Sequence, residues 1–199
     1  MTAKIKLNAA SGGGSFSLQA PSSSSNTRVM TLPDTADGTI LTTTNPKAGN
    51  IIQVVSATKT DTLTTTSTSG TDVLTAAITP SSSSNKILIQ ATSNYGLKNN
   101  YGYFVLVRDS TDIFIGNEDS NRKRVSFGTY HGNDAYYNYL HFNFHAAFLD
   151  TPSTTSAITY RLNARVSQNT MYINRTVGDD NATYEPRQAT SLILMEVAG

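Results

Sequence analysis

Apolar and polar residues alternate over most of the chain, which predicts half-buried β-strands. Between Tyr139 and Leu149, the residues Leu140, Phe142, Phe144 and Ala146 point one way and polar residues the other. The expected strands of the body are Ile51–Ala57, a short one near Leu63, Asp72–Thr79, Lys86–Asn94, Gly102–Arg108, Thr111–Ile115, Arg124–Tyr130, Tyr139–Leu149, Ala157–Val166, Thr170–Asn174 and Ser191–Val197.

Two of these strands contain apolar runs without alternation, within Lys86–Ile89 and Leu192–Met195. Such runs are typical of strands that are covered on both faces. They fit either a two-sheet sandwich or an interface between subunits.

Serine and threonine are abundant, and no window has convincing helical periodicity. About eight or more antiparallel strands in about 150 residues, joined by both short and long connections, favour a jelly-roll-like β-sandwich over an immunoglobulin-like one. We therefore expect an all-β protein.

The N-terminal quarter has a different pattern. Its alternating apolar residues are too few to offset the backbone entropy of ordering, about 1–2 kcal/mol per residue. We expect symmetry-related copies of the segment to cover them, as in a homo-oligomer. The residues assigned to this anchoring and oligomerisation role are Phe16, Leu18, Met30, Leu32 and Ile40.

Turn clusters divide the chain. Gly12–Gly14 is typical of a flexible joint, and Asn45–Gly49 of a boundary. The expected organisation is an extended N-terminal arm (1–14), a short fibre-like intersubunit β segment (15–49) and a β-sandwich domain (50–199).

Composition excludes several partners and sites. A formal net charge of +1 over 199 residues gives no long-range field for nucleic acid. No stretch approaches the roughly 20 apolar residues of a membrane helix, and the opening residues do not resemble a signal peptide. With Cys 0, disulfides and thiolate metal sites are excluded, which fits assembly in a reducing cytoplasm.

Candidate catalytic chemistry is sparse. His141 and His145 would lie about 13 Å apart along one strand, too far for a shared metal ion. Glu118–Asp119 and Asp179–Asp180 read as solvated loops, with a structural Ca²⁺ or a glycosidase pair as alternatives. We therefore expect no enzymatic activity, no catalytic residue, no metal and no cofactor.

Tyrosines cluster around two Gly/Asn turns. With Asn and Asp nearby, they suit stacking on a surface glycan, but tyrosine is also enriched at subunit interfaces. The basic run Asn121–Arg124 likewise suits either acidic loops such as Glu118–Asp119 or an acidic host polysaccharide. The candidate glycan-contact residues are Tyr95, Tyr101, Tyr130, Tyr136 and Tyr137.

Several turn and strand segments carry a family resemblance. Leu18–Pro21 (LQAP), Thr31–Asp34 (TLPD) and Gly38–Thr43 (GTILTT) resemble a segment of tail-fibre and other virion proteins of tailed bacteriophages. A group from marine phages, including cyanophages, also resembles the chain at Lys4–Gly14, Ile78–Ile87, Leu149–Ser156, Tyr172–Arg175 and Ser191–Val197.

The resemblance implies a structural virion protein: a tail-fibre, knob or decoration component. It also implies a homotrimer that contacts other virion proteins and is assembled in the host cytoplasm. The alternative is a receptor-binding module that recognises a host surface polysaccharide through the tyrosine loops.

Overall fold

The computed structural model describes residues 4–8, 11–19, 22–23, 25, 27 and 46–199. The chain divides into two compact units, Met1–Ile40 and Leu41–Gly199. The candidate anchoring residues Met30, Leu32 and Ile40 lie outside the described residues, as does the side chain of Phe16. Each unit is described by itself.

The first unit contains a β-hairpin. Strand β1 (Lys4–Asn8) pairs antiparallel with β2 (Ser15–Gln19), so Ile5 lies opposite Leu18. Gly12 and Gly13 have φ of +83° and +71° in the connection, a conformation that glycine adopts without steric cost. The glycine run expected to be a joint thus turns the chain back, and residues from the expected arm and fibre-like segment share one hairpin.

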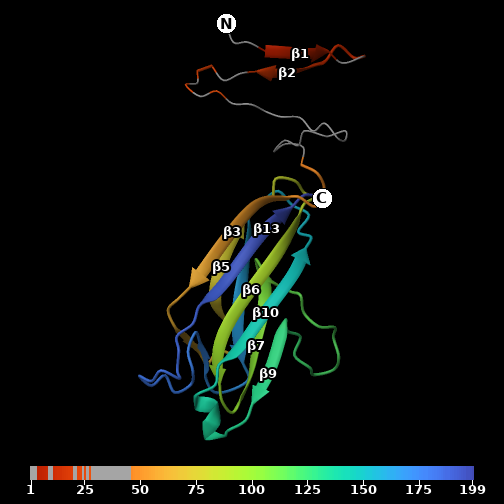
Figure 1. The fold of residues 1–199 in the computed structure, drawn as a ribbon. Coiled ribbons are helices and arrows are strands. Elements are labelled where there is room, and N and C mark those ends of the chain that lie inside the picture. The colour runs from red at the N-terminus through yellow and green to blue at the C-terminus, as the bar shows by residue number, and fades with distance from the viewer. Residues whose placement is uncertain (1–3, 9–10, 20–21, 24, 26, 28–45) are drawn as a thin grey trace, which may run out of the picture. The chain divides into compact units, whose positions relative to one another are not determined.

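The second unit is an antiparallel β-sandwich (Figure 1). Its strands are β3 (Ile51–Lys59), β4 (Leu63–Thr65), β5 (Thr71–Ile78), β6 (Lys86–Leu97), β7 (Asn100–Arg108), β8 (Thr111–Ile113), β9 (Phe127–His131), β10 (Phe142–Asp150), β11 (Ile158–Val166), β12 (Met171–Ile173) and β13 (Thr190–Val197). One 3-10 turn, η1 (Ala135–Asn138), follows β9. No described helix is long and apolar enough to span a bilayer.

The pairing of the long strands defines a jelly roll. The outermost strands in sequence, β3 and β13, pair with each other, then β5 with β11, β6 with β10, and β7 with β9. The pairs alternate between two sheets, β3-β13-β6-β10 and β5-β11-β7-β9. This is one long antiparallel ribbon folded over twice, as in a double-sheet jelly roll. The expected all-β, jelly-roll-like sandwich is therefore confirmed.

The core lies between the two sheets and follows the alternation in the sequence. Phe144 and Ala146 of β10 are buried, as are the even-numbered residues of β11 from Ile158 to Val166. Phe142 packs against this core from a half-buried position. A tight turn joins β7 to β8, and Asp109 has φ +52° there.

Only every second residue of the two apolar runs belongs to the core. Leu88, Ile193 and Met195 point away from the other sheet, and all three remain half-buried at the outer surface. Their strands alternate in burial, because the single chain covers only one of their two faces.

Candidate functional site

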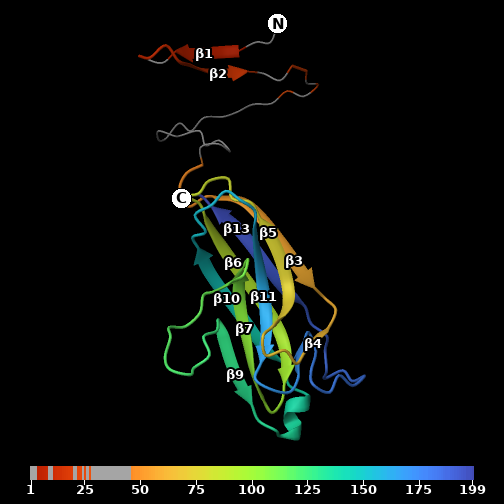
Figure 2. The same ribbon diagram turned by 180° about the vertical axis from the view of Figure 1, so that it is seen from behind.

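The tyrosine-rich loops lie at one end of the sandwich. Figures 1 and 2 show the start of β3 and the C-terminus at the opposite end from η1 and the end of β9. The entry end is closed by backbone hydrogen bonds from Gly49 N to Ala198 O and from Ala198 N to Asn50 O, both 2.9 Å. The far end, with the turns β6–β7 and β9–η1, is called the tip below.

Tyr95 is not a surface residue, contrary to the glycan-contact prediction. It is 1% exposed and packs edge-on against Phe104, with ring centroids 5.4 Å apart. Burial raises its pKa to about 12. The physical reason is that β6 continues to Leu97, beyond the expected end at Asn94, so Tyr95 falls on the inward-facing set of positions.

Tyr101 and Tyr130 form an exposed aromatic pair at the tip. They lie directly opposite each other on β7 and β9, with ring centroids 4.6 Å apart. Their exposed fractions are 49% and 51%. Such a pair presents a rigid amphipathic surface to the solvent.

Two further tyrosines occupy η1. Asp134 caps this turn by accepting a 2.8 Å hydrogen bond from the backbone N–H of Tyr136. Tyr136 is exposed, whereas Tyr137 is half-buried, with its ring centroid 5.6 Å from that of His131. Four of the five predicted tyrosines therefore lie in the surface loops and strands of the tip: Tyr101, Tyr130, Tyr136 and Tyr137.

Beside these loops, a polar hollow of about 310 Å³ opens that the sequence pattern did not reveal. Its lining includes the side-chain amides of Asn99 and Asn133 and the hydroxyl of Thr170. Asn169 donates from Nδ2 to the carbonyl of Asn99 at 2.8 Å. The hollow is lined by Lys98, Asn99, Asn133, Asn169, Thr170, Tyr172 and Val177.

The basic run pairs with its own loop. Arg122 forms a 3.0 Å ion pair with Asp119, and Nε of Arg124 donates to the carbonyl oxygen of Gly116 at 2.8 Å. Of the two readings of this run, these contacts favour pairing with acidic residues of the same chain. Beneath the loop, Phe114 and Phe148 stack with centroids 4.9 Å apart at the wall of a hollow of about 750 Å³.

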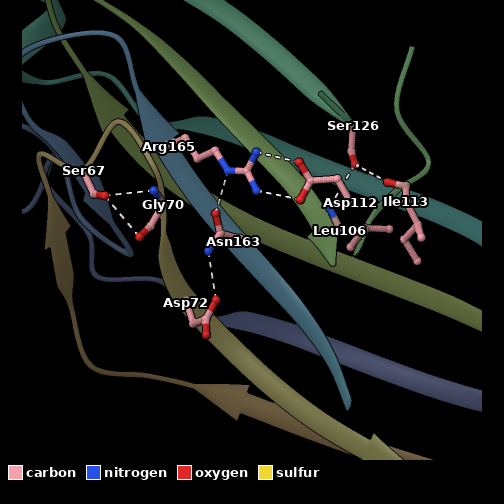
Figure 3. Close-up of polar contacts among 9 residues, drawn as sticks. All are labelled: Ser67, Gly70, Asp72, Leu106, Asp112, Ile113, Ser126, Asn163 and Arg165. Atoms are coloured by element: carbon pink, nitrogen blue, oxygen red, sulfur yellow. Dashed lines mark hydrogen bonds and ion pairs between the residues drawn. The ribbon is translucent and has the colours of Figure 1, made fainter. Parts of the chain in front are cut away.

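The outer face of the second sheet carries an ionic network (Figure 3). Arg165 of β11 makes a bidentate pair with Asp112, with both distances 2.7 Å. Its Nε donates to Asn163 Oδ1, and Asn163 donates in turn to Asp72 at 2.9 Å. The network ties β5, β11 and β8 together with every charge paired, so it reads as structural.

The remaining polar candidates show no catalytic arrangement. Asp179 accepts from Arg175 at 2.5 Å and from Arg187 at 2.7 Å. Burial alone would raise the pKa of Asp179, but these two arginines outweigh it and lower the pKa. Among the described residues, no three His, Cys, Asp or Glu side chains are grouped to hold a metal ion.

Each of the three histidines has a different environment. His141 has both ring nitrogens buried without a hydrogen-bond partner among the described residues, and burial lowers its pKa. His145 is exposed on β10. His131 stacks on Phe142 with ring centroids 3.6 Å apart, and burial lowers its pKa as well.

Comparisons with known proteins give little. No family model matches the chain, and no curated protein matches it. Among solved structures, it is similar to a chain from the structure of infectious bursal disease virus Gx strain, with a TM-score of 0.40 and 11% sequence identity. The match covers 94% of this chain and 43% of that chain. A likeness this weak does not bear on function.

Proposed function

We propose that the protein is a non-enzymatic structural component of a phage particle that associates with itself as a homotrimer. The observation that carries the proposal is the hairpin β1–β2, in which Ile5, Leu7 and Leu18 are 65%, 59% and 38% exposed. A two-stranded hairpin with an open apolar face is at best marginally stable in water. In this proposal, other copies of the chain cover this face when the protein functions.

In this proposal, the two units have separate roles. The N-terminal residues Phe16, Leu18, Met30, Leu32 and Ile40 anchor the chain to its own copies and to other virion proteins. The jelly roll forms a rigid body as a fibre, knob or decoration piece. The resemblance of the N-terminal turn and strand segments to tailed-phage virion proteins supports this assignment.

The test is incorporation of variants into particles. We expect Leu18→Asp to abolish incorporation, because it places a charge on the apolar face of β2. Ser17→Asp is the matched control, since Ser17 is adjacent on the same strand but faces the other way. Equal incorporation of the two variants would overturn the anchoring role.

A truncation provides a second test. Removal of residues 1–47 leaves Gly49 and Asn50 to bond with Ala198, so the sandwich should stay folded but fail to enter particles. Entry of the truncated chain at the level of the full chain would contradict the proposal.

A second candidate function is recognition of a host surface polysaccharide at the tip. The observation that favours it is the exposed pair Tyr101–Tyr130, beside a hollow lined by amides, at the end of the sandwich opposite the start of β3. We expect Tyr101→Ala with Tyr130→Ala to leave particle assembly intact and to slow adsorption to host cells at least tenfold. Unchanged adsorption would rule this function out.

A further inference from the structure

The polar hollow at the tip is built by three turns that are bonded to one another. The backbone N–H of Asn99, in the turn between β6 and β7, donates to the carbonyl oxygen of Gly132, in the connection from β9 to η1, at 2.8 Å. Asn169, in the connection from β11 to β12, donates to the carbonyl oxygen of Asn99, also at 2.8 Å. These bonds hold the walls of the hollow together, as in ligand pockets that are largely formed before the ligand binds.

Lys98 supplies the charge of this hollow. The other residues that line it are asparagines, a threonine, a tyrosine and a valine, and none of the lining residues is Asp or Glu. Nζ of Lys98 donates to Oδ1 of Asn138, in η1, at 3.1 Å. This amide oxygen orients the ammonium group, but it is neutral and leaves the positive charge uncompensated.

Lys98 differs in this respect from the other half-buried lysines and arginines of the sandwich. Within the described residues, each of the others forms an ion pair with an aspartate, and no ion pair includes Lys98. Moving a charge partly out of water is unfavourable, and an opposite charge offsets that cost. The position of Lys98 therefore favours an anion as its partner. The paired residues are Lys59, Arg108, Arg161, Arg165 and Arg175.

The surroundings of Lys98 suit a sugar that carries the anion. The side-chain amides of Asn99 and Asn133 and the hydroxyl of Thr170 can donate to ring hydroxyls and accept from them. The exposed pair Tyr101–Tyr130 continues the same turns and offers a surface for stacking. A volume of about 310 Å³ lies at the lower end of ligand pockets, about 300–1,000 Å³, and suits one residue of a longer chain.

We propose that the hollow binds an acidic sugar residue of a host surface polysaccharide, and that Lys98 holds the carboxylate or sulfate group of that residue. Both groups present oxygen acceptors with a negative charge, which an ammonium group binds as a point charge. The inference rests on the second candidate function, recognition of a polysaccharide at the tip, and names the chemical class of its ligand.

The experiment measures binding of sugar probes to the full-length protein by isothermal titration calorimetry at low ionic strength, where charge interactions are least screened. Oligogalacturonate is the carboxylate probe, and its methyl ester has the same sugar residues without the charge. Dextran sulfate and dextran form the corresponding pair for sulfate. We expect the charged member of at least one pair to bind about tenfold or more tightly than its neutral counterpart. The pair that responds identifies the anionic group.

Charge variants locate the binding site. Lys98→Gln should weaken binding of the charged probe about tenfold or more and leave the neutral probe unaffected. Lys86→Gln is the matched control, because Lys86 is an exposed lysine at the other end of the same strand, β6. Lys98→Arg keeps the charge and should retain binding, which keeps the test informative if Lys98→Gln does not fold.

Four outcomes would overturn the inference. Equal affinity for the charged and neutral probes would show that the ligand needs no charge, and polysaccharide recognition would stand. Equal losses from Lys98→Gln and Lys86→Gln would show an effect of net charge alone. Binding of poly-L-glutamate as tightly as of oligogalacturonate would point to an acidic peptide. Binding of none of the sugar probes would also overturn it, and adsorption of the Tyr101→Ala, Tyr130→Ala variant would then decide separately whether the tip recognises a polysaccharide.

Discussion

The hydroxyl of Tyr160 donates a 2.7 Å hydrogen bond to the carboxylate of Asp150, joining the two sheets of the sandwich. Tyr160 belongs to β11 in one sheet, and Asp150 ends β10 in the other. Asp150 also accepts from Arg108 through both carboxylate oxygens, each at 2.9 Å. Burial, with the neighbouring Asp150, raises the pKa of Tyr160, so the hydroxyl keeps its proton.

We expect Tyr160→Phe to reduce the free energy of unfolding by about 1.5–3 kcal/mol, the range for a hydrogen bond to a charged group. Urea denaturation measures the change. Tyr136→Phe, at an exposed position on η1, is the control and should be neutral. A neutral Tyr160→Phe would mean that the inter-sheet bond contributes nothing.

We expect the buried carboxylate of Glu196 to make the free energy of unfolding depend on pH in the acid range. It is 1% exposed, and its Oε1 accepts from Ser81 N, Ser81 Oγ and Asn85 Nδ2 at 2.6–2.8 Å. Burial alone would raise the pKa of Glu196, but these bonds outweigh it and hold the pKa below the ordinary 4.5. The carboxylate therefore stabilises the fold above pH 4.5, and this contribution is lost as the pH falls through the lowered pKa.

Glu196→Gln isolates this effect because it keeps an acceptor oxygen but cannot titrate. The native protein should be more stable than the variant at about pH 7, and the difference should shrink as the pH falls below the ordinary pKa of 4.5. A difference that stays constant over this range would show that Glu196 is not ionised in the folded protein.

Gly70 lies where the backbone conformation and the neighbouring Asn163 leave no room for a side chain. Its φ is +122°, and a Cβ there would lie 2.0 Å from Oδ1 of Asn163, within the network of Figure 3. Gly70→Ala should cost about 2–4 kcal/mol through backbone strain and displacement of Asn163. Gly116→Ala, where a Cβ meets nothing within 4 Å, is the control. Thermal melts that show equal losses for the two variants would contradict this reading.

We expect alanine substitutions of Tyr95 and Tyr101 to lower the free energy of unfolding by different amounts. Tyr95→Ala empties a buried site and should cost about 3–5 kcal/mol. Tyr101→Ala removes a half-exposed ring and should cost much less. Denaturant titration separates the two, and similar costs would mean that Tyr101 also supports the core.

Local patterns in the sequence were sufficient for the strands but not for the sites. The alternation around Phe144 and along β11 located the core face, because each residue's burial there depends on its own strand. Tyr95 was misplaced because strand length depends on pairing, and β12 extends the ladder of β6 to Leu97. No local pattern marks that extension.

The polar hollow could not be predicted for a similar reason. Asn99, Asn133 and Asn169 come from three different turns, which meet only after the ribbon has folded. The pairing of β1 with β2 was also missed, since a glycine run reads equally well as a linker or as a turn. The apolar runs of β6 and β13 were visible in the sequence. Which of their side chains lie next to one another on the outer face follows only from the register of the strands.

The central claim is that the chain is a structural part of a phage particle, and absolute quantification of the chain in purified particles tests it most directly. The account predicts a fixed copy number relative to the major shell protein, divisible by three for a homotrimer. A chain that is abundant in infected cells but missing from purified particles would contradict the account.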